Sequence, residues 1–322
     1  TPDFEVLEQA RAEDASLTQS NSKIYYIMAV MIGLAIPVSI LLIRKGNFSK
    51  IQEKEEIQNS SSIPILHALG KNPYNVNLPV YHYPQSPIAD SFRHIRTNLI
   101  SRLKSYNNKI ICVSSMISGE GKSFVTSNLG AILAMGGFKT VIVSADIRRP
   151  TLQKIFSTGN NPGMSSYLTD DNTNHENLIH PTEINNLSLI PPGKSTANSG
   201  DLLSTDKIET LLDYLSTRFE FILFDSPPFS MVPEARIISE SSYCNIFVLR
   251  HNYSPINVIG ALNDIYQEGR IKNMFLVVNA IKQTKGIGFE YYFGYDSSYG
   301  FGDYKNYYNS YSGNKHNPKH LN

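Results

Sequence analysis

The chain has 322 residues, more than the roughly 100–200 residues of a usual single domain, so one sizeable domain with accessory segments is expected. Its 29 Lys and Arg residues against 28 Asp and Glu residues give a net charge of +1, which excludes the overall basic field that sequence-independent nucleic-acid binding requires. Two widely separated cysteines, Cys112 and Cys244, exclude a disulfide framework and a cysteine-based zinc site.

A long apolar run, Ile24–Ile43, contains no charged residue. As a helix it would span about 30 Å, the thickness of a bilayer core, so the sequence predicts a transmembrane helix over residues 24–43. A signal peptide is the competing interpretation, but the run is too long for one and no small-residue cleavage site follows it. Arg44 and Lys45 come directly afterwards, so the positive-inside rule predicts residues 1–23 as an extracytoplasmic juxtamembrane segment and a cytoplasmic domain after the helix.

The rest of the chain divides by composition into three parts. Residues 44–86 are polar, with a charged run followed by a Pro- and Asn-rich stretch, and this predicts a cytoplasmic linker. Residues 87–285 alternate apolar strands with amphipathic helices, which indicates an α/β domain with a mostly parallel sheet flanked by helices. Strands are expected over 109–115, 140–145, 187–190, 221–225, 245–250 and 274–279, and helices over 122–136 and 205–218.

A third composition begins at residue 286, where Gly, Tyr, Ser and Asn dominate and aliphatic residues are few. Such a segment buries too little apolar surface to order itself, so residues 286–322 are predicted to be a flexible tail. The tail concentrates tyrosines, the candidate phosphoacceptors: Tyr291, Tyr292, Tyr295, Tyr299, Tyr304, Tyr307, Tyr308 and Tyr311.

A phosphate-binding motif lies where the first predicted strand of this domain meets its helix. Residues 116–123 read Met-Ile-Ser-Gly-Glu-Gly-Lys-Ser and fill the eight positions of a P-loop, although Met116 replaces the first glycine of the strict pattern. Its glycines allow backbone N–H groups to face phosphates, and Lys122 would reach the β- and γ-phosphates. The predicted ATP-binding residues of the loop are Ser118, Gly119, Glu120, Gly121, Lys122 and Ser123.

Two carboxylates end neighbouring apolar strands. Asp225 follows residues 221–224, as a Walker B carboxylate does, and Asp146 follows residues 141–145. Because ligands of open α/β sheets bind at the carboxyl ends of the strands, both acids are expected near the P-loop. The sequence therefore predicts a Mg²⁺ site formed by Ser123, Asp146 and Asp225, and a catalytic set of Lys122, Asp146 and Asp225.

Together these motifs resemble the bacterial protein-tyrosine kinases, or BY-kinases, that are attached to polysaccharide chain-length regulators. In that family, Asp-x-Asp-x-Arg forms an extra phosphate motif and Asp-x-Pro-Pro a second one. They correspond to residues 144–148 and 225–228 here, and the match adds Arg148 to the ATP-binding set. The segment 277–279, Val-Val-Asn, is a further match. The resemblance implies ATP and Mg²⁺ as cofactors and autophosphorylation of the tail tyrosines of a neighbouring subunit.

The resemblance also carries implications for assembly. Asp90, Arg93 and Arg96 are similar to the Glu-x-x-Arg-x-x-Arg helix through which the family oligomerises into rings, with Asp90 in place of Glu, and their spacing suits one helical face. The transmembrane helix matches the last span of the regulator. The implied setting is the bacterial inner membrane with a cytoplasmic kinase, and the implied partners are further copies of the chain, polysaccharide export machinery and a tyrosine phosphatase.

One departure from the family pattern keeps two alternatives open. The first Asp of Asp-x-Asp-x-Arg, the family's candidate general base, is Ser144 here. An ATP-binding pseudokinase that regulates polysaccharide export structurally is therefore one alternative. The other is a membrane ATPase similar to MinD and ParA, which carry the pattern Lys-Gly-Gly-x-Gly-Lys. The first lysine of that pattern would fall at Ile117 here. The missing lysine, the apolar helix and the Tyr-rich tail count against this alternative.

Overall fold

The structure is a computed structural model that describes residues 22–47, 50–52, 54–107, 109–159, 161–170, 173–193 and 205–281. It contains two compact units, residues 1–49 and residues 50–322. The tail tyrosines, from Tyr291 onwards, lie outside the described residues.

The first unit contains one long helix, α1 (Ser22–Asn47), with Pro37 inside it. Within the described part of the chain, it is the one helix that is long and apolar enough to cross a membrane. The window Lys23–Ile40 has a mean hydropathy of 1.8, and none of it is buried in the protein. Length and apolar composition therefore agree with the predicted transmembrane helix.

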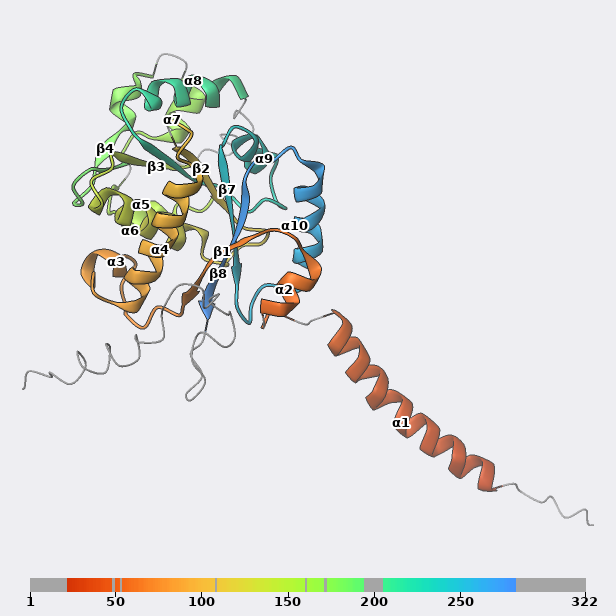
Figure 1. The fold of residues 1–322 in the computed structure, drawn as a ribbon. Helices are drawn as coiled ribbons and strands as arrows, with labels where there is room; N and C mark the ends of the chain where they lie inside the picture. Colours follow the sequence, from red (N-terminus) through yellow and green to blue (C-terminus); the bar gives the residue numbers. More distant parts are fainter. Residues whose placement is uncertain are drawn as a thin grey trace, which may run out of the picture. The chain divides into compact units, whose positions relative to one another are not determined.

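The second unit is built on an eight-stranded sheet with strand order β1-β8-β7-β2-β6-β3-β5-β4 (Figure 1). All neighbouring strands pair in parallel except β4 and β5. This confirms the predicted mostly parallel sheet, and each predicted strand is present within two residues of its expected ends. The strands are β1 (Ile65–Gly70), β2 (Lys109–Ser114), β3 (Thr140–Ser144), β4 (His180–Pro181), β5 (Leu187–Ile190), β6 (Phe221–Asp225), β7 (Cys244–Arg250) and β8 (Met274–Ile281).

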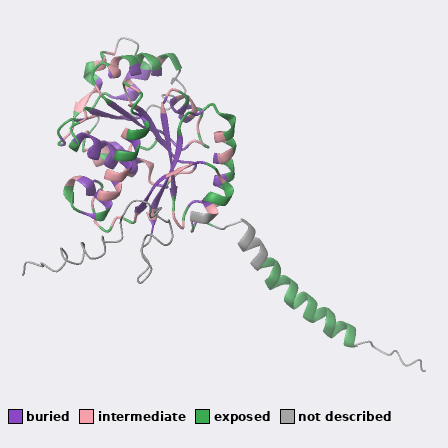
Figure 2. Cartoon of the chain, viewed as in Figure 1, coloured by how far each residue is buried: buried purple, intermediate pink, exposed green. Residues whose placement is uncertain are grey.

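Helices cover both faces of this sheet, so most residues of its central strands β2, β3, β6, β7 and β8 are buried (Figure 2). The helices of the second unit are α2 (Lys54–Ser60), α3 (Pro79–His82), α4 (Pro87–Arg102), α5 (Lys122–Met135), α6 (Thr151–Ile155), α7 (Met164–Thr169), α8 (Thr205–Ser216), α9 (Pro233–Glu240) and α10 (Asn257–Glu268), with a short 3₁₀ helix at His175–Leu178.

Alternate residues of each strand point to opposite faces of the sheet. In β2, Ile111 and Val113 pack in one core with α4 and α5, whereas Ile110 and Cys112 pack in another with α7, α8 and α9. A third core joins α2 and α10 to β7 and β8. Figure 1 shows α4 and α5 on the opposite side of the sheet from α10.

The linker predicted over residues 44–86 is wrong for residues 50–86, which belong to the second unit. They form α2, β1 and α3, and β1 pairs in parallel with β8. Their apolar side chains enter the cores: Ile51, Ile57 and Leu69 are fully buried. The polar composition concealed this because β1 is buried by pairing with β8, a strand that lies far away in the sequence.

Candidate active site

The phosphate-binding loop connects the end of β2 to the start of α5, as predicted. Gly119 and Gly121 have φ angles of +90° and +98°, a region that glycine enters without steric cost. Gly121 is the N-cap of α5, so the positive end of the helix dipole faces the loop. The loop is therefore shaped to direct backbone N–H groups at an anion.

The two predicted carboxylates meet the first residues of α5. Lys122 Nζ lies 2.6 Å from Asp146 Oδ2, and Ser123 Oγ donates to Asp225 Oδ2 over 2.7 Å. Asp225 ends β6, the strand between β2 and β3, and Asp146 follows the end of β3. Strand order thus places the Walker B acid directly beside the P-loop.

These charged groups are largely buried, and burial together with the neighbouring charges shifts their pKa values. Burial raises the pKa of Asp225, although the Lys122 ammonium and the Ser123 hydroxyl oppose the shift. Burial would lower the pKa of Lys122, but Asp225 and Asp146 outweigh it and raise that pKa. Lys122 therefore remains an ammonium at neutral pH and can neutralise phosphate oxygens.

The oxygen groups around Ser123 fit a magnesium ion. Mg²⁺ prefers hard oxygen ligands and takes one or two carboxylates together with substrate phosphates and water. The Ser123 hydroxyl and the Asp225 carboxylate already share a hydrogen bond, and Asp225 Oδ1 also accepts from Thr126 Oγ1 at 3.4 Å. Within the described ranges no three His, Cys, Asp or Glu side chains cluster as a metal site, and a metal bound partly by phosphates does not need such a cluster.

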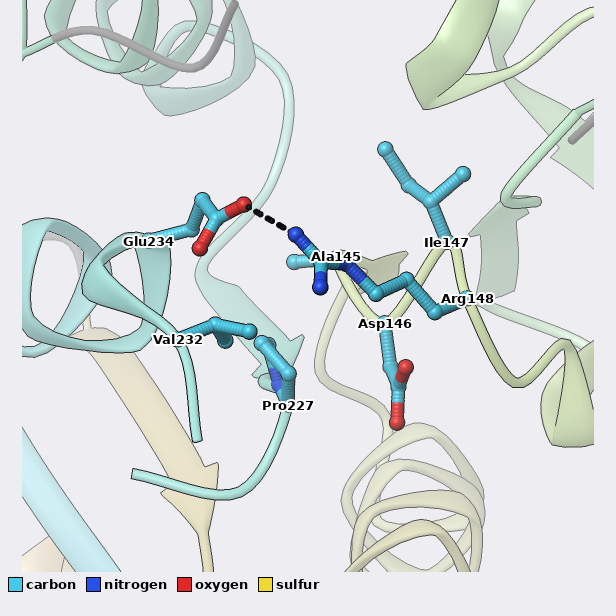
Figure 3. Close-up of a pocket in the computed structure, with 7 residues that line it drawn as sticks. All are labelled: Ala145, Asp146, Ile147, Arg148, Pro227, Val232 and Glu234. Carbon is cyan, nitrogen blue, oxygen red and sulfur yellow. Dashed lines mark hydrogen bonds and ion pairs between the residues drawn. The ribbon is translucent and has the colours of Figure 1, made fainter. Parts of the chain in front are cut away.

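The adjacent arginines Arg148 and Arg149 point to different places. Arg148, predicted to bind ATP, lies 3.3 Å from Glu234 Oε1, while the Asp146 carboxylate points away from this pair (Figure 3). Arg149 instead donates to the Ser118 hydroxyl of the P-loop, and its backbone N–H donates to Asp146 Oδ1 over 3.1 Å. The sequence pattern did not identify Arg149, because it does not show which way neighbouring loop residues turn.

Ser144 and Glu120 complete the set of residues at the loop. Ser144 is the last residue of β3, is paired in register with Asp225, and is buried. Glu120, predicted as an ATP-binding residue, is fully buried with its side chain directed into the protein. Burial raises its pKa to about 7, against the hydrogen bonds that it accepts from Ser254 and Ile117. Glu120 can therefore contact a phosphate only through its backbone N–H group.

The predicted oligomer residues make contacts within their own chain. Arg93 lies 2.5 Å from Asp90 on α4, and Arg96 Nη1 donates to the Ile132 carbonyl in the last turn of α5 over 3.0 Å. Asp90 and Arg93 stay partly exposed. Arg96 therefore has a structural role in the protomer that the family resemblance did not suggest.

Comparisons with known proteins identify the family of the chain. An AAA-domain family model matches residues 108–271, which include the P-loop and both carboxylates. The tyrosine-protein kinase CpsD of Streptococcus agalactiae is 32% identical over 219 residues, 67% of this chain and 88% of that protein. This chain belongs to the bacterial tyrosine-kinase family. The resemblance stated from the sequence is thereby confirmed.

Two further members and neighbours define the extent of the match. The tyrosine-protein kinase ptk of Acinetobacter johnsonii is 28% identical over 270 residues, 80% of this chain. The chain spans only 37% of the length of that kinase. Among solved structures, the chimerical protein CapA2B2 is 28% identical with a TM-score of 0.65, and the match covers 71% of this chain and 100% of that one.

Proposed function

We propose that this chain is the catalytic part of a bacterial tyrosine kinase that transfers the γ-phosphate of Mg-ATP to its own C-terminal tyrosines. The supporting observation is the convergence of Lys122, Asp146 and Asp225 beside a glycine-shaped P-loop. Membership of the tyrosine-kinase family supports tyrosine as the acceptor rather than water alone. The tail carries eight candidate acceptors, Tyr291 to Tyr311, within a short stretch.

Each residue has a defined part in this reaction. The P-loop N–H groups and the Lys122 ammonium bind the β- and γ-phosphates and neutralise charge that builds up during transfer. Ser123, Asp225 and Asp146 are the residues that would hold Mg²⁺, which would supply positive charge to neutralise the phosphates. Arg149, anchored to Ser118, adds a second positive charge at the mouth of the loop.

The acceptor hydroxyl needs orientation more than early deprotonation. A tyrosine hydroxyl has a pKa of about 10, and phosphoryl transfer proceeds through a loose transition state in which positioning dominates. One of the two buried carboxylates, Asp146 or Asp225, orients the hydroxyl in this proposal, since Ser144 carries no charge. The position of Ser144 in place of an acid favours one second candidate, an ATP-binding pseudokinase.

The proposed setting is the bacterial inner membrane, with α1 as the anchor and the kinase in the cytoplasm. The apolar composition of α1 and the positively charged Arg44 and Lys45 that follow its apolar run support this orientation. Copies of the chain would exchange tails in trans within a ring, with Asp90 and Arg93 at the contacts. Polysaccharide export machinery and a tyrosine phosphatase are the proposed partners.

A mixing experiment tests both the activity and its direction. Full-length chain in detergent is incubated with Mg-ATP and probed with an anti-phosphotyrosine antibody, and Lys122→Met should abolish the signal. An epitope-tagged Lys122→Met chain with an intact tail is then mixed with a catalytically intact chain in which all eight tail tyrosines are Phe. Labelling of the tagged chain supports transfer in trans.

Two outcomes would contradict this proposal. A wild-type chain that binds Mg-ADP but never labels its tail, while a Ser144→Asp variant does, indicates the pseudokinase. Persistent labelling of Lys122→Met alone means that the reacting phosphate is bound elsewhere.

A further inference from the structure

The carbonyl groups of the P-loop have their own binding partners. A loop whose N–H groups face a phosphate turns its carbonyls the other way, where side-chain donors can reach them. The Ser118 carbonyl accepts from the Tyr253 hydroxyl over 2.9 Å, and the Gly119 carbonyl accepts from Arg250 Nη1 over 2.9 Å. The Glu120 carbonyl accepts from Asn279 Nδ2 over 3.0 Å. Three successive carbonyls are therefore held by three side chains.

These side chains also pack against the glycine α-carbons. A Cβ atom at Gly119 would lie 2.6 Å from the Tyr253 hydroxyl, and one at Gly121 would lie 2.1 Å from Asn279 Nδ2. Both distances are far below van der Waals contact. Glycine is therefore required at both positions for two reasons: the positive φ angle, and the lack of a Cβ atom that would clash with these donors.

The turn that carries Arg250 and Tyr253 is tied to the loop at a further point. The Ser254 hydroxyl donates to Glu120 Oε1 and accepts from the Arg250 backbone N–H over 2.7 Å. Glu120 Oε2 accepts from the Ile117 N–H over 2.9 Å. The buried carboxylate of Glu120 therefore joins the turn to the beginning of the P-loop.

The start of the second unit, at Ile51, forms backbone hydrogen bonds with the turn at residues 250–254. The Ile51 N–H donates to the Ser254 carbonyl over 3.0 Å, and the Ile51 carbonyl accepts from the Asn252 N–H over 2.9 Å. The side chain of Ile51 is fully buried. Asn252 has a φ angle of +55°, a conformation that Asn tolerates better than most residues. Arg250 and Tyr253 are thus presented by a turn that these hydrogen bonds hold in place, and Asn279 is presented by β8.

We propose that Arg250, Tyr253 and Asn279 form a carbonyl clamp, a set of positioning residues that holds the P-loop in its phosphate-binding conformation before the nucleotide arrives. The inference rests on nucleotide binding by the P-loop, which is part of the proposed function. Donors that are already aligned spare the nucleotide the cost of ordering the loop, so they strengthen binding of substrate and transition state equally. The clamp should therefore affect nucleotide affinity and KM more than kcat.

Two variants of the full-length chain in detergent remove single donors. Tyr253→Phe deletes only a hydroxyl, and Arg250→Met deletes the guanidinium but keeps much of the side-chain length. Each should weaken Mg-ADP binding, measured by isothermal titration calorimetry, by about three- to tenfold, as expected for one lost hydrogen bond. The KM for ATP should rise by the same factor with kcat within about twofold, and Arg250→Lys should recover part of the affinity.

Matched controls separate the clamp from general damage. Tyr243→Phe removes a hydroxyl from a tyrosine that stacks on Tyr106, and Arg236→Met removes an exposed arginine paired with Glu240 and Glu268. Neither should change Mg-ADP affinity. Thermal unfolding without nucleotide should be the same for Tyr253→Phe and Tyr243→Phe.

Several outcomes would overturn the clamp while leaving the kinase proposal intact. They are unchanged Mg-ADP affinity in both Tyr253→Phe and Arg250→Met, an equal loss in the controls, a loss of kcat at constant KM, and a loss of affinity that only parallels a lower unfolding temperature. A wild-type chain that binds no Mg-ADP overturns the proposed function as well, so the two failures are distinguishable.

Discussion

The two sides of the P-loop are held by different kinds of interaction. On the phosphate side, the contacts are ionic or involve carboxylates: Lys122 with Asp146, and Ser123 with Asp225. On the opposite side, Arg250, Tyr253 and Asn279 donate to neutral carbonyl oxygens. Charged partners can be exchanged when phosphate and Mg²⁺ arrive, whereas the carbonyl contacts have no new partner to take. The phosphate side should therefore govern the rate of transfer, and the carbonyl side should govern affinity.

The largest expected effect is on the phosphate side. Asp225→Asn removes the buried negative charge that would hold Mg²⁺ beside Ser123 in the proposed reaction, and Asp146→Asn removes the partner of Lys122. Each should lower the initial rate of tail phosphorylation by about 10²–10³-fold, the usual cost of losing a preorganised electrostatic group. Quantitative anti-phosphotyrosine time courses measure the rate. Asp264→Asn on the exposed side of α10 is the control and should keep the wild-type rate.

Glu120 lies between the two sides and should give the stability of the fold a pH dependence. Its pKa is raised from 4.5 to about 7 in the folded protein, so folding favours the protonated carboxyl group. The stability that this protonation contributes is fully present below about pH 4.5 and is lost as the pH rises through 7. Glu120→Gln cannot ionise and should lack that loss. The difference in unfolding free energy between Glu120→Gln and wild type should therefore shift in favour of the variant by up to roughly 3 kcal/mol between pH 4.5 and pH 8.

Urea unfolding in detergent at pH 4.5 and pH 8 measures this difference. The comparison uses the change between the two pH values, because other buried acids such as Asp225 also have raised pKa values and contribute to both proteins. Parallel pH profiles for wild type and Glu120→Gln would show that Glu120 is already ionised in the folded protein.

The two adjacent arginines sharpen the comparison further. Arg149 reaches Ser118 of the P-loop, whereas Arg148 pairs with Glu234 (Figure 3). Arg149→Ala should lower kcat for tail phosphorylation by about tenfold, because it removes a positive charge near the transferred phosphate. Arg148→Ala should have a smaller effect, and Arg149→Lys should recover part of the loss. A larger loss of kcat in Arg148→Ala than in Arg149→Ala would indicate that Arg148, the arginine of the family motif, contacts the phosphate.

Local sequence carried much of this site but not all of it. The P-loop, Asp146 and Asp225 follow apolar strands directly, so short patterns suffice to find them, and Asn279 belongs to the Val-Val-Asn segment that matches the family. Arg250 and Tyr253 have no such signal. They reach Ser118 and Gly119 only because β7 lies next to β2 in the sheet, a non-local fact.

The same limit explains the segment 50–86. Ile51, Ile57 and Leu69 look isolated among polar residues, and a window-based interpretation predicts a linker. Ile51 and Ile57 are buried because α10, β7 and β8 supply the opposing surface, and Leu69 is buried in the core on the other face of the sheet, with α4 and α5. Long-range pairing cannot be deduced from local composition, so the fold class was predictable while the domain boundary was not.

The smallest expected effect concerns the two arginines of α4. Arg96 donates to a carbonyl in the last turn of α5, where a cation also favours the negative end of the helix dipole. Arg96→Ala should therefore lower the free energy of unfolding by about 1 kcal/mol. Arg93→Ala should change it by less than about 0.5 kcal/mol, because both partners of Arg93, the Asp90 carboxylate on the same helix and the Pro84 carbonyl just before it, are at exposed or partly exposed positions.

This difference decides which variant can test assembly. A loss of oligomers in Arg96→Ala could follow from a weakened α5, the helix that carries the P-loop, whereas Arg93→Ala leaves the protomer intact. We expect Arg93→Ala to reduce the mass measured by light scattering in detergent while its urea midpoint stays at the wild-type value. Wild-type mass in Arg93→Ala would remove Arg93 from the proposed interface, and a shifted midpoint would show that it too supports the protomer.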